Sequence, residues 1–88
     1  MKIVKFSAIW CPECLIMRPR WKKIQADFPE QEIEDIDADA YPEKKKAYGV
    51  DHIPTIIFYD RAGAEIERVK TLMEIEEIAV KINNYQDK

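Results

Sequence analysis

In the first third of the chain, a short run of apolar residues is followed by a helical pattern of apolar positions. Ile3-Val4-Lys5-Phe6 is β-branched and aromatic, which is typical of a strand. Pro12 suits the first turn of a following helix, Pro29 ends it, and Pro19 inside it predicts a kink. The helix is indicated by apolar residues at spacings of three and four: Cys14, Met17, Trp21, Ile24 and Phe28.

The middle of the chain predicts an edge strand, a short helix and a hairpin. Residues 33–38 carry acidic side chains, which suit the edge of a sheet because charge there discourages pairing with other chains. Pro42 to Tyr48, followed by a glycine, has the pattern of a short helix. Residues 55–59 and 65–70 predict two strands joined by a turn over residues 60–63.

A last helix follows the hairpin. Thr71 to Glu74 has the pattern of a capping box, and an apolar helical face comes after it: Ile75, Ile78, Ala79 and Ile82. The element order is therefore β-α-β-α-β-β-α, and its first βαβ unit predicts parallel strands with a right-handed crossover. We expect residues 1–88 to form a single α/β domain with a four-stranded mixed sheet and three helices.

Composition narrows the class of protein. Apolar residues make up 47% and charged residues 35%, which is typical of a folded globular chain. The net charge of −3 argues against nucleic acid or an anionic membrane as the main partner. No apolar run approaches the roughly 18 residues of a membrane span, and residues 1–6 lack the apolar stretch of a signal peptide. We therefore expect a cytoplasmic protein.

The two cysteines, Cys11 and Cys14, stand where the first strand gives way to the helix. A small secreted domain held by disulfides would carry more cysteines, and a bridge here would close only a tiny loop. At a helix N-terminus, free N–H groups and the helix dipole favour an anion, and the thiolate is the nucleophile of disulfide exchange. The position of the pair therefore indicates a role in disulfide exchange and not in stabilising the fold.

Each cysteine has an expected role. Cys11 lies at the loop end and is expected to be exposed, whereas Cys14 lies on the apolar helix face and is expected to be more buried. Cys11 would attack a substrate disulfide and form a mixed disulfide. Cys14 would then attack the Cys11 Sγ, release the reduced substrate and leave an internal disulfide.

Two other interpretations of the pair are weaker. Structural zinc takes four ligands, but the chain has one such pair and a single histidine, His52. A site within one chain would need carboxylates as further ligands, and a dimer sharing two pairs would also complete a site. Two inert buried cysteines would not explain why one of them opens a helix. We expect no metal and no prosthetic group, since the redox-active disulfide itself carries the electrons.

Two motifs together resemble the thioredoxin superfamily. They are Trp10-Cys11-Pro12-Glu13-Cys14 after a strand and Ile53-Pro54-Thr55 at the start of a later one. The resemblance runs from Ile3 to about Tyr85, and it implies a minimal thioredoxin-like fold that begins at the strand before the cysteines. It further implies a cis Ile53–Pro54 bond against the cysteine pair.

The resemblance also implies how a substrate binds. Trp10 would form part of an apolar docking surface beside Cys11. The backbone of Ile53, next to Pro54, would pair with an extended substrate segment as an added strand.

The sequence departs from the family pattern at positions that affect the thiols. Glu13 puts a carboxylate near Cys11, where a negative charge disfavours the thiolate. We therefore expect the Cys11/Cys14 couple to be more reducing than in a Glu13→Gln variant. The family commonly holds a buried carboxylate beneath the pair with a lysine beside it. By the resemblance these positions are Lys5 and Asp35, with their charges exchanged.

Two interpretations of that exchange remain open. Lys5 would accept the Cys14 proton if burial lowered its pKa, although Asp35 would oppose this. Otherwise Lys5 and Asp35 are two solvated side chains.

The sequence as a whole predicts a dithiol–disulfide oxidoreductase that reduces protein disulfides. Its electrons would come from a partner reductase or a low-molecular thiol. Glutathione is less expected as a dedicated cosubstrate, because residues 70–76 lack the glycine pair and aspartate of a glutaredoxin site. The alternative is a non-enzymatic redox sensor or docking module whose cysteine pair switches state without turnover.

Overall fold

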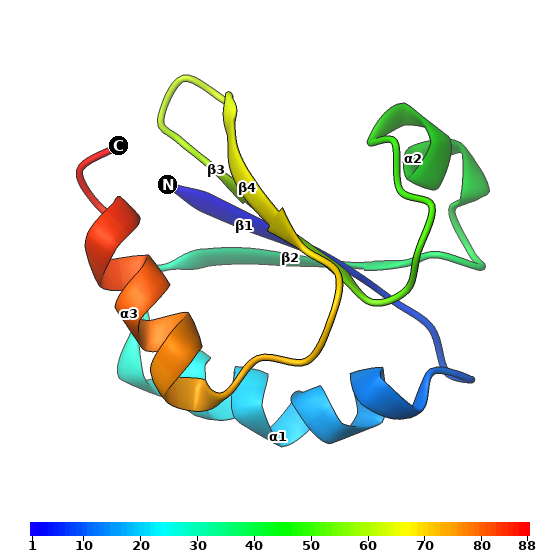
Figure 1. Cartoon of the computed structure of the whole chain (residues 1–88), viewed down its shortest axis with the longest axis horizontal. Coiled ribbons are helices and arrows are strands. Elements are labelled where there is room, and N and C mark those ends of the chain that lie inside the picture. The colour runs from blue at the N-terminus through cyan, green and yellow to red at the C-terminus, as the bar shows by residue number, and fades with distance from the viewer.

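The computed structural model describes residues 1–88 and confirms the predicted order of elements (Figure 1). Each strand and helix lies within a few residues of its expected position, and the helix over residues 12–27 runs through Pro19 without interruption. The elements are β1 (Lys2–Ser7), α1 (Pro12–Asp27), β2 (Glu32–Asp37), α2 (Pro42–Ala47), β3 (Thr55–Tyr59), β4 (Glu65–Val69) and α3 (Ile75–Tyr85).

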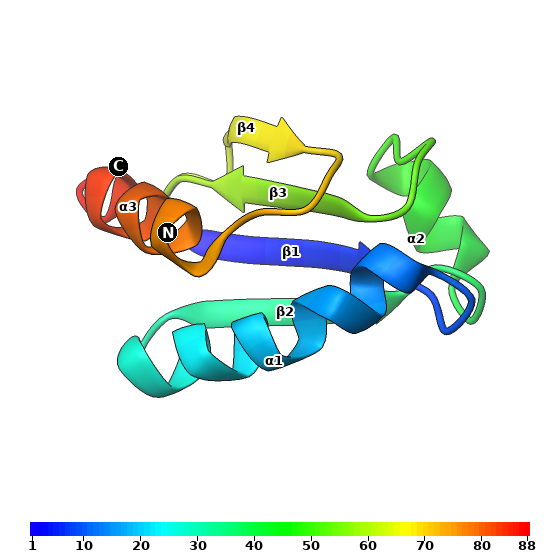
Figure 2. The ribbon, with the colours of Figure 1, turned by 60° about the horizontal axis from the view of Figure 1, so that its bottom comes forward.

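The four strands form one mixed sheet in the order β2-β1-β3-β4 (Figure 2). β1 and β2 are parallel, and β3 is antiparallel to both β1 and β4. β2 is therefore an edge strand, as its acidic side chains predict. In this register Lys5 of β1 stands beside Asp35 of β2 and Ile56 of β3.

The larger core lies between the sheet and the two long helices, α1 and α3, which cover one face (Figure 1). Because side chains alternate along a strand, Ile3 and Lys5 point to this face while Val4 and Phe6 point away. Burying each large apolar side chain contributes about 1.5–3 kcal/mol. The nine buried members are Ile3, Met17, Trp21, Ile24, Ile56, Phe58, Met73, Ile78 and Ile82.

A smaller core on the opposite face anchors the segment that follows α2. It is formed by Val4, Phe6, Ile36, Ala38, Val50 and Ile57. Tyr48 packs edge-on against Phe6 with ring centroids 5.3 Å apart, and Arg68 of β4 donates to the Tyr48 carbonyl at 3.0 Å. Gly49 adopts a φ of 66°, the left-handed conformation that ends many helices. These contacts fix the chain just before Pro54.

The capping box predicted over Thr71 to Glu74 is wrong. The helix α3 begins later, at Ile75, and Glu74 is its N-cap without a side-chain hydrogen bond. The chain first crosses to α1, where Met73 is buried in the larger core and Arg20 donates to the Met73 carbonyl at 2.9 Å. Burial of Met73 therefore outweighs the local capping signal. None of the helices has the length and apolar character needed to cross a membrane.

Candidate active site

Cys11 is the N-cap residue of α1. The backbone N–H of Cys14 donates to the Cys11 Sγ at 3.1 Å, and the Cys11 N–H donates to the Ala8 carbonyl at 3.2 Å. A side chain that accepts from the first turn satisfies one of the unpaired N–H groups of a helix start. The same contact stabilises negative charge on the sulfur, together with the positive end of the helix dipole.

Both thiols are free and both are buried. Cys11 is 2% exposed and Cys14 is 8% exposed. The expectation that Cys11 would be exposed and Cys14 more buried is therefore wrong. The reason is tertiary: Ala8 from the loop before α1 clusters with the two cysteines, and Ile53 from a distant part of the chain packs against them.

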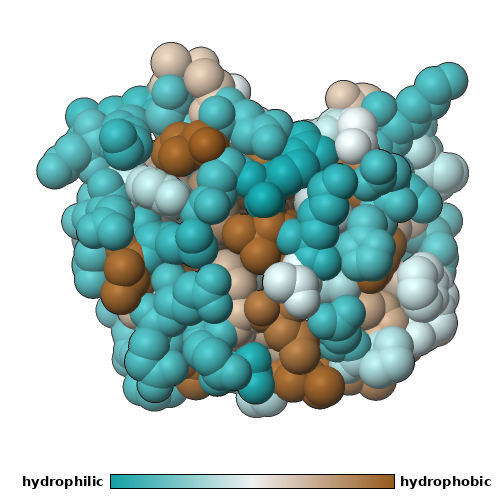
Figure 3. Space-filling view, in the orientation of Figure 1, coloured by the Kyte–Doolittle hydropathy of each residue, from teal (hydrophilic) through white to brown (hydrophobic).

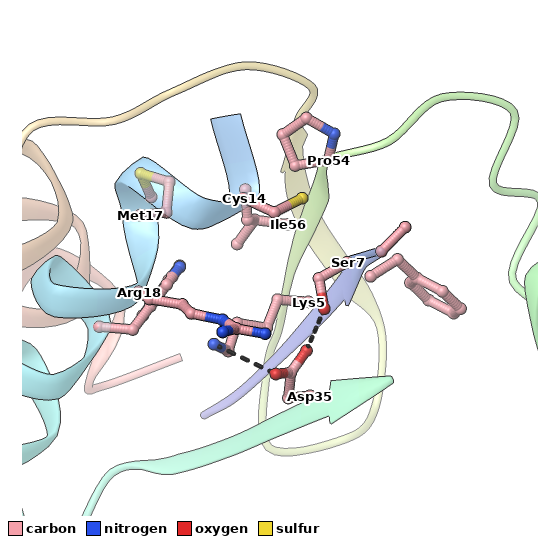
Figure 4. Close-up of a pocket in the computed structure, with 11 residues that line it drawn as sticks. Lys5, Ser7, Cys14, Met17, Arg18, Asp35, Pro54 and Ile56 are labelled. Carbon is pink, nitrogen blue, oxygen red and sulfur yellow. Dashed lines mark hydrogen bonds and ion pairs between the residues drawn. The ribbon is translucent and has the colours of Figure 1, made fainter. Parts of the chain in front are cut away.

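The Ile53–Pro54 peptide bond is cis, which confirms that expectation. Pro54 lies directly before β3 and lines a cavity together with Cys14 (Figure 4). The Thr55 hydroxyl donates to the His52 carbonyl and closes the turn around the proline. The segment on either side of Pro54 is thereby held against the cysteine pair.

Trp10 is 61% exposed beside the buried cysteines. Its Nε1–H donates to the Asp39 Oδ2 at 2.8 Å, and Asp39 in turn follows β2. Ile9, Leu15 and Ile16 are also exposed, so apolar surface surrounds the start of α1. Figure 3 shows apolar atoms gathered along the lower edge of the molecule, where α1 runs, on a face that is otherwise mainly hydrophilic.

A small cavity of about 30 Å³ lies beneath Cys14 (Figure 4). That volume is enough for a water molecule, and polar groups border it. The Cys14 thiol, the Lys5 amine, the Ser7 hydroxyl and the Asp35 carboxylate all face it. Its lining residues are Lys5, Phe6, Ser7, Ala8, Cys14, Met17, Arg18, Trp21, Pro54, Ile56 and Asp35.

Lys5 and Asp35 form an ion pair at the floor of this cavity. Their Nζ and Oδ2 atoms are 3.6 Å apart, and the Ser7 hydroxyl donates to the Asp35 Oδ1 at 2.9 Å. The Lys5 side chain is 17% exposed and that of Asp35 53%, so the pair is half-buried. Burial lowers the pKa of Lys5, while Asp35 acts to raise it.

Burial raises the pKa of the Cys14 thiol to about 11. A hydrogen bond with Cys11 adds to the rise, the Ala8 backbone opposes it, and the negative charge of Asp35 adds a smaller contribution. Cys14 therefore holds its proton at neutral pH. A reaction in which Cys14 is a nucleophile needs a group that accepts this proton.

Sequence reasoning missed three residues of the site: Ser7, Arg18 and Asp39. Arg18 lines the cavity from α1, and its charge contributes to lowering the pKa of Lys5. Glu13 stands in the first turn of α1, between the two cysteines, as expected. The chain has no cluster of three or more His, Cys, Asp or Glu side chains that could hold a metal ion.

Comparisons with known proteins agree with this geometry. The sequence model of the Thioredoxin family matches residues 1–84. A thioredoxin of Chlamydia muridarum is 32% identical over 84 residues, which are 96% of this chain and 81% of that protein. The protein disulfide-isomerase erp38 of Neurospora crassa is 41% identical over 70 residues; the match covers 74% of this chain but 19% of that longer protein.

Solved structures show the same likeness in three dimensions. Thioredoxin 1 from the thermophilic eubacterium Thermosipho africanus TCF52B superposes with a TM-score of 0.83 and is 31% identical. The superposition covers 99% of this chain and 96% of that one.

Proposed function

Because the chain belongs to the thioredoxin family and is a thiol-disulfide oxidoreductase with a Cys-x-x-Cys pair, we propose that it reduces disulfides of protein substrates in the cytoplasm. The observation that carries the proposal is the Cys11 Sγ at the N-cap of α1, three residues from a second free thiol. A sulfur in that position accepts a backbone N–H and faces the positive end of the helix dipole.

The first step is attack of the Cys11 thiolate on one sulfur of a substrate disulfide. A bond forms between the Cys11 Sγ and that sulfur, the substrate S–S bond breaks, and the other substrate sulfur leaves as a thiolate with the electron pair. Cys11 has little solvent exposure, so the docked substrate must reach it through the surface beside Trp10.

The second step resolves the mixed disulfide. Cys14 loses its proton and attacks the Cys11 Sγ, and the second substrate sulfur leaves as a thiolate. We assign the proton to Lys5, whose amine faces the cavity beneath Cys14 and whose pKa burial lowers. Asp35 restrains this role because its carboxylate favours the Lys5 ammonium.

Substrate docking is assigned to Trp10, Ile53 and Pro54. The Trp10 indole is exposed beside Cys11, and its hydrogen bond to Asp39 fixes the ring. The Ile53 backbone lies two residues before β3, next to the cis proline, where an extended substrate segment can pair with it.

Electrons would return from a partner reductase or a low-molecular thiol. The raised pKa of Cys14 supports the direction of reduction, because it leaves the dithiol without a stabilised second thiolate. A dithiol–disulfide couple is more reducing when its dithiol form lacks the stabilisation that a second thiolate would give.

The test is a disulfide reduction assay with insulin as substrate and dithiothreitol as electron donor. Wild type should accelerate reduction above the dithiothreitol background, and Cys11→Ser should not. The serine oxygen can still cap α1, so the variant removes the nucleophile without removing the cap. Wild type that performs no better than Cys11→Ser would favour the redox sensor or docking module instead.

A trapping experiment identifies the substrates. In Cys14→Ser the second step is blocked, so mixed disulfides between Cys11 and substrate proteins should accumulate and be released by dithiothreitol. Cys11→Ser is the matched control, because it keeps Cys14 but lacks the attacking thiol. Equal capture by both variants would contradict the assignment of Cys11 as nucleophile.

A further inference from the structure

The cavity beneath Cys14 continues into an open groove between α1 and the edge strand β2. Four residues line both spaces: Lys5, Arg18, Trp21 and Asp35. The groove is also lined by Lys22, which does not reach the cavity. The polar groups under the thiol therefore lie between a buried sulfur and bulk water.

Charged and aromatic groups face the Lys5 amine from two elements. Asp35 of β2 lies 3.6 Å away, and the centroid of the Trp21 ring on α1 lies 5.1 Å away; both favour the ammonium form. Arg18 and the Cys14 thiol face it from α1, while β3 contributes only apolar groups, among them Ile56. Figure 4 shows the Arg18 and Lys5 side chains converging on Asp35.

Arg18 is the one fixed cation among these groups. Arg20 and Arg68 donate to backbone carbonyls, whereas Arg18 forms no hydrogen bond or ion pair within the chain. A guanidinium stays protonated at every pH at which a protein works, so it cannot take up the Cys14 proton itself. It acts only through its charge on the neighbouring groups.

Building on the function proposed above, we propose that Arg18 is a positioning residue for the resolving step: its permanent charge beside the Lys5–Asp35 pair offsets the Asp35 carboxylate and keeps the Lys5 amine able to accept the Cys14 proton. A second cation close to Lys5 disfavours the ammonium form. This effect on Lys5 speeds the transfer of the Cys14 proton.

The resolving step uses the Cys14 thiol, the Lys5 amine and the mixed disulfide on Cys11. The Cys14 proton moves to the neutral Lys5 amine, which becomes an ammonium. The Cys14 sulfur bonds to the Cys11 Sγ, and the bond from Cys11 to the substrate sulfur breaks. The substrate leaves as a thiolate with that electron pair, and Lys5 later returns its proton to water through the groove.

The reaction of the reduced protein with 5,5′-dithiobis(2-nitrobenzoate) separates the two steps. Attack by Cys11 releases the first coloured thiolate, and attack by Cys14 on the mixed disulfide releases the second. Stopped-flow absorbance across a range of pH gives a profile for each phase. The first phase reports Cys11, and the second reports the step in which Arg18 is proposed to act.

Arg18→Gln should leave the first phase unchanged and move the profile of the second to higher pH. We expect a shift of about half a pH unit, which slows the second phase about threefold at neutral pH. The shift is small because the Arg18 side chain is exposed, and water screens its charge. Arg18→Lys, which keeps the charge, should restore the wild-type profile. Asp35→Asn should shift it in the opposite direction, to lower pH.

Lys22→Gln is the matched control, because it removes a cation from the same groove but not from the cavity. Its profile should equal wild type. In a Lys5→Met background, Arg18→Gln should shift the pH profile of the second phase much less than it does in the wild-type background. Two residues that act through each other are not additive. An unchanged second phase in Arg18→Gln, or an equal shift in Lys22→Gln, would overturn the role of Arg18. Failure of wild type to reduce insulin would overturn the proposed function instead.

Discussion

At the scale of single residues, one sulfur atom serves both the helix and the chemistry. The Cys11 Sγ accepts the Cys14 N–H at the start of α1 and is also the proposed nucleophile. A helix cap usually uses an oxygen of Ser, Thr, Asp or Asn. Here the group that caps the start of the helix is the group that reacts, so secondary structure fixes the position of the nucleophile.

Glu13 is expected to make the couple more reducing. Glu13 is in the first turn of α1, between the two cysteines in the sequence, and a negative charge near a thiolate disfavours it. Glu13→Gln should therefore raise the reduction potential, and a redox titration of both proteins against a thiol buffer measures the difference. A wild-type potential equal to or above that of the variant would contradict this effect.

The sequence predicts the reacting residues of the site better than their surroundings. The cysteine pair and the cis bond before Pro54 follow from local motifs and the family resemblance. Asp39 is 29 positions from Trp10, and Arg18 lies on the polar side of a helix, so no local pattern marks either one. The low exposure of Cys11 depends on Ile53, a contact that only the folded chain brings about.

At the scale of elements, regular spacing of apolar residues predicts nearly all the boundaries. The pattern in α1 predicts its buried face because each of those side chains packs on the same sheet. The start of α3 is the exception. A capping motif is a local preference worth about 1 kcal/mol, and burial of Met73 contributes more.

The packing of α3 on the sheet should dominate its contribution to stability. Ile78 is fully buried in the larger core, so Ile78→Ala should lower the free energy of unfolding by about 2–5 kcal/mol. Val80→Ala is the control on the same helix, because Val80 is exposed and should change stability by less than about 0.5 kcal/mol. Urea denaturation followed by circular dichroism measures both, and similar losses in the two variants would contradict the assignment of the core face.

Glu67 joins β4 to α3 and should make stability depend on acid pH. Hydrogen bonds from Lys81 and Tyr85 hold the pKa of Glu67 below its ordinary value of 4.5. As the pH falls, Glu67 is therefore protonated in the unfolded state before it is protonated in the folded state. The stability that Glu67 contributes is fully present above about pH 5 and is lost as the pH falls through the pKa of the folded state. The contribution should be at most about 1 kcal/mol, since the side chains are partly exposed.

Thermal unfolding of Glu67→Gln between pH 7 and pH 3 tests this dependence. The variant should start less stable at pH 7 and lose less on acidification than wild type. Glu30→Gln, an equal change of charge at an exposed position between α1 and β2, should follow the wild-type curve. Parallel curves for wild type and Glu67→Gln would rule out the contribution of Glu67.

At the scale of the whole molecule, the sheet separates two cores, and the cysteine cluster lies at one end of it. Strands β1 and β3 contribute to both cores, so neither core can lose its packing alone. We therefore expect residues 1–88 to unfold as one cooperative unit. Circular dichroism and tryptophan fluorescence should give coincident urea transitions, with an m value of about 1 kcal/mol/M, and separate midpoints would contradict a single domain.

The burial of the Cys11 sulfur also has a consequence for chemical damage. Oxidation of cysteine to the sulfinic and sulfonic acids is irreversible in most proteins, and it proceeds fastest at thiolates that solvent can reach. Cys11 is only 2% exposed, so peroxide in solution has little access to its thiolate. The low exposure of Cys11 should therefore slow its over-oxidation by small oxidants in solution.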